Sequence, residues 1–152
     1  MKTLHSESML QRQCFTWFRL QYPKLALNLV AIPNGGQRSQ KEAAIMSGEG
    51  VVPGVADAVL FIPSYVNQTT YHTLCIEFKT VTKTVGRDGK VTERKTYQSE
   101  VQKAWQAAVE ATHNKYVVVR SLEEFMAEIK AYFVKPSGMI SAIALRAIGI
   151  PF

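Results

Sequence analysis

The chain has 152 residues, 18 Lys and Arg against 12 Asp and Glu, and a formal net charge of +6 at pH 7. This length is typical of one domain with its own core, and two cysteines are too few for a disulfide scaffold or a four-cysteine zinc site. No apolar run is long enough to cross a bilayer, and residues 1–7 lack the apolar core of a signal peptide. We therefore expect a single cytoplasmic domain over residues 1–152, with no membrane contact.

Apolar residues recur at helical spacing in some segments and run together in others, with Gly and Pro clusters between them. Helical spacing predicts helices, and short apolar or β-branched runs predict strands. Their alternation predicts an α/β fold with a central mixed sheet. In chain order we expect a helix over residues 6–22, a strand over 25–32, a turn at 33–36, helical turns over 40–47, a strand over 56–62, a polar loop over 64–70, a strand over 71–80 that continues over 80–85, a returning strand over 91–95, a helix over 98–112, a strand over 115–120, and a helix capped by Ser121 that ends before Pro136.

Most of the positive charge lies in one segment, residues 79–103. It holds seven basic and three acidic residues, and so four of the six net positive charges. The Asp88–Gly89 pair predicts a tight turn between two β-branched runs, which indicates a hairpin. This hairpin is either a solvated arm whose lysines discourage edge pairing or an arm that contacts nucleic-acid phosphates. Charge alone does not separate these two interpretations.

Two acidic residues fall beside or inside apolar strand sequences. Asp57 precedes the run at 58–62, and Glu77 lies in the sequence Ile-Glu-Phe-Lys at 76–79. Because a strand alternates its side chains, Glu77 and Lys79 share a face while their neighbours point into a core. Buried carboxylates are costly unless they are paired or bind a metal, and two of them suit a hard cation such as Mg²⁺. The alternative is a surface ion pair of Glu77 and Lys79 on an edge strand, with Asp57 as a turn residue.

The chemistry that this pattern favours is metal-assisted hydrolysis of a phosphodiester. A metal held by the two carboxylates would polarise a phosphate oxygen and lower the pKa of a bound water. Lys79 could orient that water or stabilise developing negative charge. The sequence contains no phosphate-binding glycine loop or dinucleotide fingerprint, so we expect no nucleotide cofactor.

Five short blocks follow one another along the chain. They are IPNGG at residues 32–36, GVVPGVAD at 50–57, IEFK at 76–79, SEVQ at 99–102 and VVVRS at 117–121. With these blocks in this order, the chain resembles the virus-type replication-repair nuclease (VRR-NUC) family of the PD-(D/E)xK, restriction-endonuclease-like group, from the first helix to about Leu122. It departs from that family at Ala56, where a proline is usual, and in the long basic hairpin that follows the IEFK block.

The resemblance implies a restriction-endonuclease-like core of order αβββαβ, a central mixed sheet flanked by helices, with the basic hairpin as an insertion. The core covers about residues 5–134, and residues 135–152 form a C-terminal extension that could contact a second subunit. The implied activity is that of a Mg²⁺-dependent DNA endonuclease, with Mn²⁺ as a substitute, acting as a homodimer on branched DNA such as a four-way junction. The alternatives are a flap or single-strand nuclease, or a non-catalytic DNA-binding module with the same fold.

The resemblance also assigns roles to individual residues. It implies that Asp57 and Glu77 are metal ligands, that the Phe78 main-chain carbonyl completes the coordination, and that Lys79 is the catalytic lysine. Further residues are expected at the site or on the DNA: Gln102 beside the carboxylates, Glu7 as a support of the metal through water, Asn34 near the site, and Lys83, Arg87, Lys90, Arg94, Lys95 and Lys103 as phosphate contacts.

Aromatic side chains and cysteines carry weaker signals. Exposed aromatic rings can stack on nucleic-acid bases, but aromatic residues at such spacing lie more often in a core or an interface. Cys14 and Cys75 fall in apolar patterns, so we expect buried hydrophobes and not nucleophiles. The aromatic candidates for stacking are Trp17, Tyr71, Tyr97 and Trp105.

Overall fold

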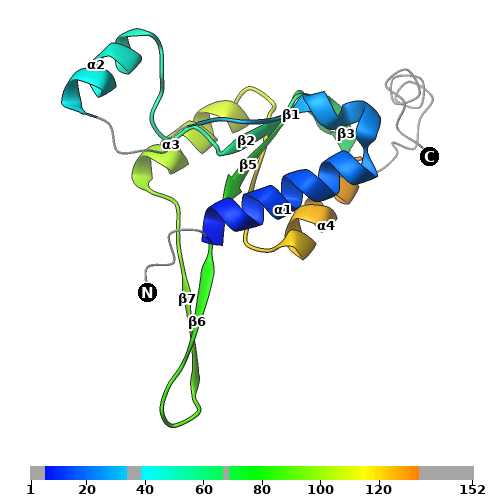
Figure 1. Ribbon diagram of the computed structural model, residues 1–152. Helices are drawn as coiled ribbons and strands as arrows, with labels where there is room; N and C mark the ends of the chain where they lie inside the picture. Colours follow the sequence, from blue (N-terminus) through cyan, green and yellow to red (C-terminus); the bar gives the residue numbers. More distant parts are fainter. Residues whose placement is uncertain (1–5, 34–38, 67–68, 134–152) are drawn as a thin grey trace.

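The computed structural model describes residues 6–33, 39–66 and 69–133, and its main body is a sheet with helices on both faces (Figure 1). The helices are α1 (Ser6–Gln21), the short 3-10 helix η1 (Pro23–Asn28), α2 (Gln40–Gly48), α3 (Glu100–Glu110) and α4 (Leu122–Tyr132). The strands are β1 (Leu29–Ala31), β2 (Ala58–Leu60), β3 (Ser64–Val66), β4 (Thr69–Tyr71), β5 (Leu74–Phe78), β6 (Val81–Val85), β7 (Val91–Lys95) and β8 (Lys115–Val119).

The central sheet has the strand order β1-β2-β5-β8. Its first three strands are antiparallel neighbours, and β8 runs parallel to β5. The parallel pair needs a crossover, and α3 supplies it between β5 and β8. Taken with α1 and α3, the four strands of this sheet follow the chain order αβββαβ, with the remaining elements inserted between them or added after β8. This order confirms the predicted fold class.

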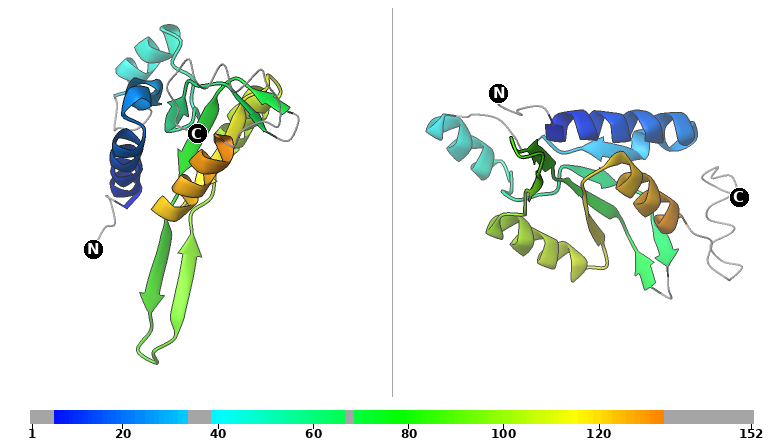
Figure 2. Two further views of the ribbon diagram at one scale, coloured as in Figure 1. Left: turned by 90° about the vertical axis from the view of Figure 1, so that its right-hand side faces the viewer. Right: turned by 90° about the horizontal axis from the view of Figure 1, so that it is seen from below.

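Alternate side chains of β5 pack into two separate apolar clusters, one on each face of the sheet. Ile76 and Phe78 point into the larger cluster, which α1 and α4 cover from one side. Cys75 points to the other face, where Trp105 and Val109 of α3 pack against a smaller cluster. Figure 2 shows the sheet between these helices. The larger cluster also contains Leu10, Cys14, Phe15 and Phe18 of α1, Leu74 and Val117 of the sheet, and Phe125, Ile129 and Tyr132 of α4.

The strand expected over residues 25–32 is wrong for its first half, which forms η1. Pro23 stands at the start of this 3-10 helix, where its missing N–H is harmless. Leu25 and Leu29 are buried, whereas Leu27 between them is 93% exposed. A strand would place all three side chains on one face, so this burial pattern is incompatible with a strand through Leu27.

Residues 64–70, expected to be a polar loop, instead form β3 and the first two residues of β4, which pair as a small antiparallel ribbon. The ribbon is held to α4 by a hydrogen bond from the Ser64 hydroxyl to the Tyr132 carbonyl. The Tyr132 hydroxyl in turn donates to the Ile62 carbonyl at 2.7 Å. The polar composition of these residues did not predict the ribbon, because the ribbon depends on contacts with a helix some 70 residues further along the chain.

The strand expected from residue 71 through residue 85 is divided into three. They are β4, β5 and β6. The middle strand, β5, ends at Phe78, and the Lys79 N–H makes its final ladder bond, to the Val119 carbonyl at 2.9 Å. The next N–H, of Thr80, turns to the Thr96 hydroxyl at 2.9 Å. This change of partner starts the separate hairpin β6–β7, which projects away from the sheet (Figure 1).

The turn of this hairpin confirms the Asp-Gly prediction. The Gly86 N–H donates to the Lys90 carbonyl at 2.8 Å, and the Gly89 N–H donates back to the Gly86 carbonyl at 2.9 Å. Gly89 has a φ of +76°, the conformation expected of the glycine that follows a type I turn in a three-residue hairpin loop.

Two further expectations concern the ends and the cysteines. Asn34 and the extension at 135–152 lie outside the described residues. Cys14 and Cys75 are both buried, as predicted, and burial raises the pKa of each thiol, to about 12 for Cys14. Among the described helices, none has the length and apolar character needed to cross a membrane.

Candidate active site

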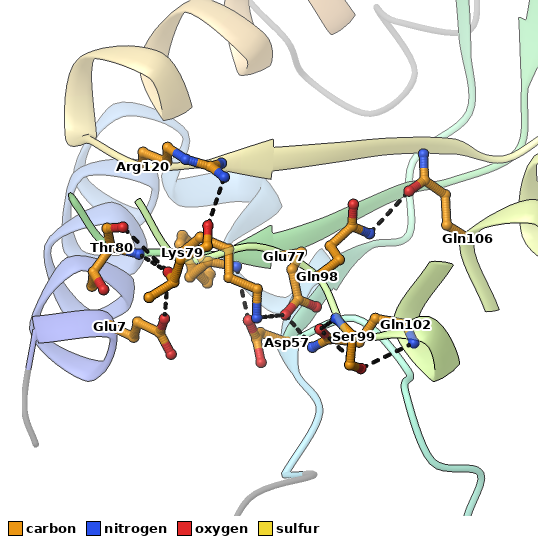
Figure 3. A network of polar contacts seen from close by, with 12 residues as sticks. Glu7, Asp57, Glu77, Lys79, Thr80, Gln98, Ser99, Gln102, Gln106 and Arg120 are labelled. Carbon is orange, nitrogen blue, oxygen red and sulfur yellow. Dashed lines mark hydrogen bonds and ion pairs between the residues drawn. The ribbon is translucent and has the colours of Figure 1, made fainter. Parts of the chain in front are cut away.

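Antiparallel pairing of β2 and β5 brings the two predicted carboxylates together. Ala58 is the register partner of Ile76, so the preceding residue, Asp57, lies opposite Glu77. Asp57 Oδ2 accepts a hydrogen bond of 2.8 Å from the Phe78 N–H, which holds the carboxylate against the last residue of β5. Figure 3 shows both carboxylates with Lys79 beside them.

Glu77 lies inside the sheet and has three hydrogen-bond donors around it. Its side chain is 1% exposed, and its Oε1 is 2.7 Å from the Lys79 Nζ. The Gln102 amide donates to the same oxygen, and the Tyr116 hydroxyl donates to Oε2 at 3.3 Å. Since β5 lies between β2 and β8, the interpretation of Glu77 and Lys79 as a surface ion pair on an edge strand is wrong.

The first turn of α3 carries Gln102 to the site. Ser99 is the N-cap, and Gln102 completes a capping box with its Oε1 accepting from the Ser99 N–H at 2.9 Å. The amide nitrogen of the same side chain remains for Glu77. Gln102 therefore joins the helix end to the carboxylate, and this agrees with its predicted place beside the site.

Gly54 allows the loop before Asp57 to approach α3. It has a φ of +82°, and a Cβ at this position would lie 2.5 Å from the Val101 carbonyl oxygen. Only glycine satisfies both the backbone conformation and the close contact. The Pro53-Gly54 pair of the sequence thus sets the distance between the loop that carries Asp57 and the helix that carries Gln102.

Burial dominates the electrostatics of the carboxylates. It raises the pKa of Asp57, against the opposing effects of the Phe78 N–H and of Lys79. It also raises the pKa of Glu77, where Lys79 opposes the shift and the negative charge of Asp57 adds to it. Two carboxylates that repel each other in a desolvated place would both be stabilised by a cation between them.

Glu7 lies at the edge of this site. It stands in the first turn of α1, and its Oε1 is 3.4 Å from the hydroxyl oxygen of Thr96, which donates to it. Its charge is one of the causes that raise the pKa of Asp57. The structure therefore brings Glu7 near Asp57. Nevertheless, among the described residues, no group of three or more Asp, Glu, His or Cys side chains forms a metal-binding cluster.

The arrangement of these elements was compared with known proteins. Among solved structures, one described as "VRR_NUC domain protein" matches with a TM-score of 0.64 and 23% sequence identity, over 88% of this chain and 91% of that chain. The chain has a VRR-NUC-like fold. Comparisons with protein-family models and with curated proteins found no match. The resemblance inferred from five sequence blocks is therefore confirmed at the level of the fold.

Within this VRR-NUC-like fold, the predicted phosphate-contacting residues lie along the hairpin and at the start of α3. Two of them form ion pairs: Lys83 with Glu93 at 3.0 Å and Lys103 with Glu100 at 2.7 Å. In the part of the chain that the structure describes, the other hairpin bases form no ion pair. They are Arg87, Lys90, Arg94 and Lys95.

Sequence reasoning missed Tyr116 and Arg120 as residues of this region. Tyr116 was predicted only as part of the strand over residues 115–120, yet its hydroxyl reaches Glu77 and its pKa is raised, first by burial and then by the Glu77 charge. Arg120 donates to the Thr96 carbonyl at 2.8 Å and so holds the base of the hairpin to the end of β8. A buried tyrosine needs a partner for its hydroxyl, which was the available signal for Tyr116.

Proposed function

We propose that the chain is a metal-dependent nuclease that hydrolyses phosphodiester bonds of DNA. The observation that carries the proposal is the juxtaposition of Asp57, Glu77 and Lys79 inside the sheet. An ion pair that served only stability would have little reason to be buried, because desolvation of the two charges offsets most of their attraction. The fold that the chain shares with a solved VRR_NUC domain protein supports the same conclusion.

The donor set suits Mg²⁺ or Mn²⁺. Carboxylate and carbonyl oxygens are the ligands of hard cations, and a bound metal would supply Lewis-acid activation of the phosphate and of the attacking water. Asp57 and Glu77 would hold it. Because the N–H and the carbonyl of a strand residue point to the same side of the strand, and the Phe78 N–H binds Asp57, we include the Phe78 carbonyl oxygen among the proposed ligands.

The other residues orient these groups. Lys79 offers its ammonium group to the phosphate or to the attacking water, because a charge held beside Glu77 is already positioned before substrate binds. Gln102 and Tyr116 fix the rotamer of Glu77 through its two oxygens. We assign to Glu7 the support of the metal through water that the resemblance implies, and its electrostatic effect on Asp57 supports this assignment.

The hairpin supplies the DNA-binding arm of the proposal. Arg94 pairs with Thr82 across the two strands, and the Thr84–Thr92 pair lies on the same face, so this face is polar and carries no acid. The opposite face carries the Lys83–Glu93 ion pair, whose charges cancel, together with the exposed Val85 and Val91 and, at its base, Lys95. We therefore assign the threonine and Arg94 face to the phosphates of the substrate, with Arg87 and Lys90 at the turn. Lys95, at the base of the hairpin on the opposite face, is a separate proposed phosphate contact. Lys103 and Asn34 remain further proposed contacts.

The decisive experiment incubates the protein with four-way, flap, duplex and single-stranded DNA, with Mg²⁺, with Mn²⁺ and with EDTA. We expect cleavage that requires the metal and that falls by at least about 100-fold in Asp57→Ala and Lys79→Ala. No metal-dependent cleavage of any substrate would overturn the proposed activity and leave a DNA-binding module. Cleavage that survives both substitutions would overturn the assignment of the site.

A homodimer acting on branched DNA is the finer form of this proposal. Symmetrical cleavage of a four-way junction requires two active sites, which a two-fold dimer provides. The molar mass of the full chain in solution, measured by light scattering with and without a four-way junction, tests this form. A monomer in both samples would contradict it without affecting the nuclease activity itself.

A further inference from the structure

A cavity of about 480 Å³ opens beside the edge strand β8, away from the carboxylate pair. Lys95 and Tyr97, from the returning end of the hairpin, form part of its wall, and Val118 and Arg120 of the β8 end form another. Glu124 and Glu128 of α4 contribute the acidic side chains of the lining. The proposed catalytic chemistry uses none of these six side chains, and only Lys95 is already among the proposed phosphate contacts.

The aromatic group of this cavity is exposed and held next to a cation. Tyr97 is 74% exposed, whereas Trp17, Tyr71 and Trp105, the other aromatic candidates, pack against the two core clusters. The Arg120 guanidinium lies over the Tyr97 ring, 5.8 Å from its centroid. Its hydrogen bond to the Thr96 carbonyl fixes it there. An exposed ring beside a fixed guanidinium is a stacking platform of the kind that binds unpaired bases.

The charges of the cavity favour an anion at one end. Glu124 accepts a hydrogen bond of 2.7 Å from the main-chain N–H of Arg120, and Glu128 forms an ion pair with Lys115 at 2.9 Å. Lys115 thus neutralises Glu128, whereas Glu124 keeps its charge because a main-chain N–H carries none. The lining therefore has two cations, Lys95 and Arg120, against one uncompensated acid. Lys95, by contrast, forms no ion pair with any residue that the structure describes. A phosphate is thus the expected partner of Lys95 and Arg120.

The position of the cavity relates it to the catalytic strand. Val118 is the register partner of Glu77, and paired residues of neighbouring strands project from the same face of a sheet. Adjacent strands lie about 4.8 Å apart. A nucleic-acid strand whose phosphate reached Glu77 would pass this cavity within a few nucleotides.

We propose that the cavity binds one unpaired nucleotide of the substrate, with its base stacked on Tyr97 and its phosphate near Lys95 and Arg120. Its place in catalysis rests on the proposed nuclease function, whereas the binding itself does not. Bases inside a duplex are stacked on their neighbours and cannot reach Tyr97. The cavity therefore selects DNA with a frayed, flapped or branched strand beside the cleaved bond over continuous duplex.

The test measures affinity by fluorescence anisotropy in EDTA, where no metal-dependent cleavage occurs, with a short single strand and with a duplex of the same sequence. We expect Tyr97→Ala to weaken binding of the single strand about tenfold and to change binding of the duplex by less than about twofold. Tyr97→Phe keeps the ring and should bind as the parent does. Phe61→Ala, which removes another exposed aromatic ring, is the matched control.

Each other outcome overturns the proposal in a recognisable way. Unchanged single-strand affinity in Tyr97→Ala removes the stacking role, and an equal loss for duplex reduces Tyr97 to a general contact. If Tyr97→Ala instead lowered the molar mass of the protein in light scattering, the cavity would be a protein interface. Should Tyr97→Ala lower the melting temperature, Lys95→Gln replaces it, with an expected fall of about 0.7 in the salt slope for the single strand.

The outcome is independent of the catalytic claim. Loss of single-strand binding in Tyr97→Ala by a protein that cleaves nothing would support the cavity and defeat the nuclease. Metal-dependent cleavage, together with a single-strand affinity that Tyr97→Ala leaves unchanged, would support the nuclease and defeat the cavity as a binding site.

Discussion

The central sheet and the hairpin each contain a lysine–glutamate ion pair, in opposite surroundings. Lys79 and Glu77 are 2.7 Å apart with side chains 11% and 1% exposed, and Lys83 and Glu93 are 3.0 Å apart with side chains 66% and 48% exposed. The first pair gives up most of its hydration, so it must be held by further donors. The second remains in water and is worth little. The same pair of residue types thus indicates chemistry in the sheet and solubility in the hairpin.

The largest expected difference between the two regions follows removal of the lysine charge. Lys79→Met leaves Glu77 buried without its cation, and we expect the free energy of unfolding to fall by about 3 kcal/mol at pH 7. Lys83→Met, the matched change in the hairpin, should lower it by less than about 0.5 kcal/mol. Denaturant titrations measure both. Equal losses would mean that the burial of Glu77 has no energetic consequence, and the comparison would fail.

Two glycines with positive φ provide the second contrast. Gly54→Ala adds a Cβ 2.5 Å from the Val101 carbonyl oxygen, and we expect a loss of about 3 kcal/mol together with weaker positioning of Gln102. Gly89→Ala meets no atom within 4 Å and should lose only about 1 kcal/mol through its φ of +76°. Thermal unfolding of both variants tests this order, and a greater loss in Gly89→Ala would contradict it.

The third prediction concerns pH and metal. Because burial raises the folded-state pKa of Asp57 and Glu77, the folded chain binds protons more tightly than the unfolded chain. Their contribution to stability therefore falls as pH rises from the ordinary carboxyl range through the raised pKa values, and it is lowest above them. A cation between the carboxylates relieves this loss. We expect Mg²⁺ at 100 times its Kd to add about 2.7 kcal/mol to the free energy of unfolding.

The control for that prediction is Asp57→Asn, which removes one of the two charges. It should flatten the fall in stability with pH and abolish most of the stabilisation by Mg²⁺. Stabilisation by Mg²⁺ that persists in this variant, or that is greater in acid than at neutral pH, would count against a metal between Asp57 and Glu77. Calorimetric melting at several pH values measures both effects.

The smallest effect on stability is expected when charges on the hairpin are reversed, although the same change should weaken DNA binding. Lys90→Glu with Arg94→Glu should change the free energy of unfolding by less than about 0.5 kcal/mol, since both side chains are exposed. The same change should weaken duplex binding and reduce the salt slope by about two. Lys24→Glu, an exposed charge in η1, is the control. An unchanged salt slope would mean that the hairpin is a solvated arm that does not contact DNA.

Local pattern was enough to predict the core of the site. Alternation along the IEFK block placed Glu77 and Lys79 on one face and Ile76 and Phe78 on the other, and the structure confirms both. This prediction succeeded because the period of a strand is a property of a few consecutive residues. The hairpin was predictable for the same reason, since the Asp88–Gly89 pair requires only its immediate neighbours.

Contacts between distant segments escaped prediction. The 3-10 turn at Leu27 and the β3–β4 ribbon depend on which face of the core lies nearby, and no local pattern contains that information. The Tyr116 hydrogen bond to Glu77 joins two strands that are 39 positions apart. Arg120 reaches the Thr96 carbonyl across 24 positions.

The sequence by itself determined the fold class, the alternation that buries Glu77, and the concentration of positive charge in the hairpin. Each follows from the order of residue types over short stretches. Only the tertiary structure decided that β5 is an interior strand, that Gly54 sets α3 against the Asp57 loop, and that Tyr97 is exposed beside Arg120. These three features depend on how segments that are far apart in the chain pack together. In a densely packed protein, one close contact between such segments excludes other arrangements of them.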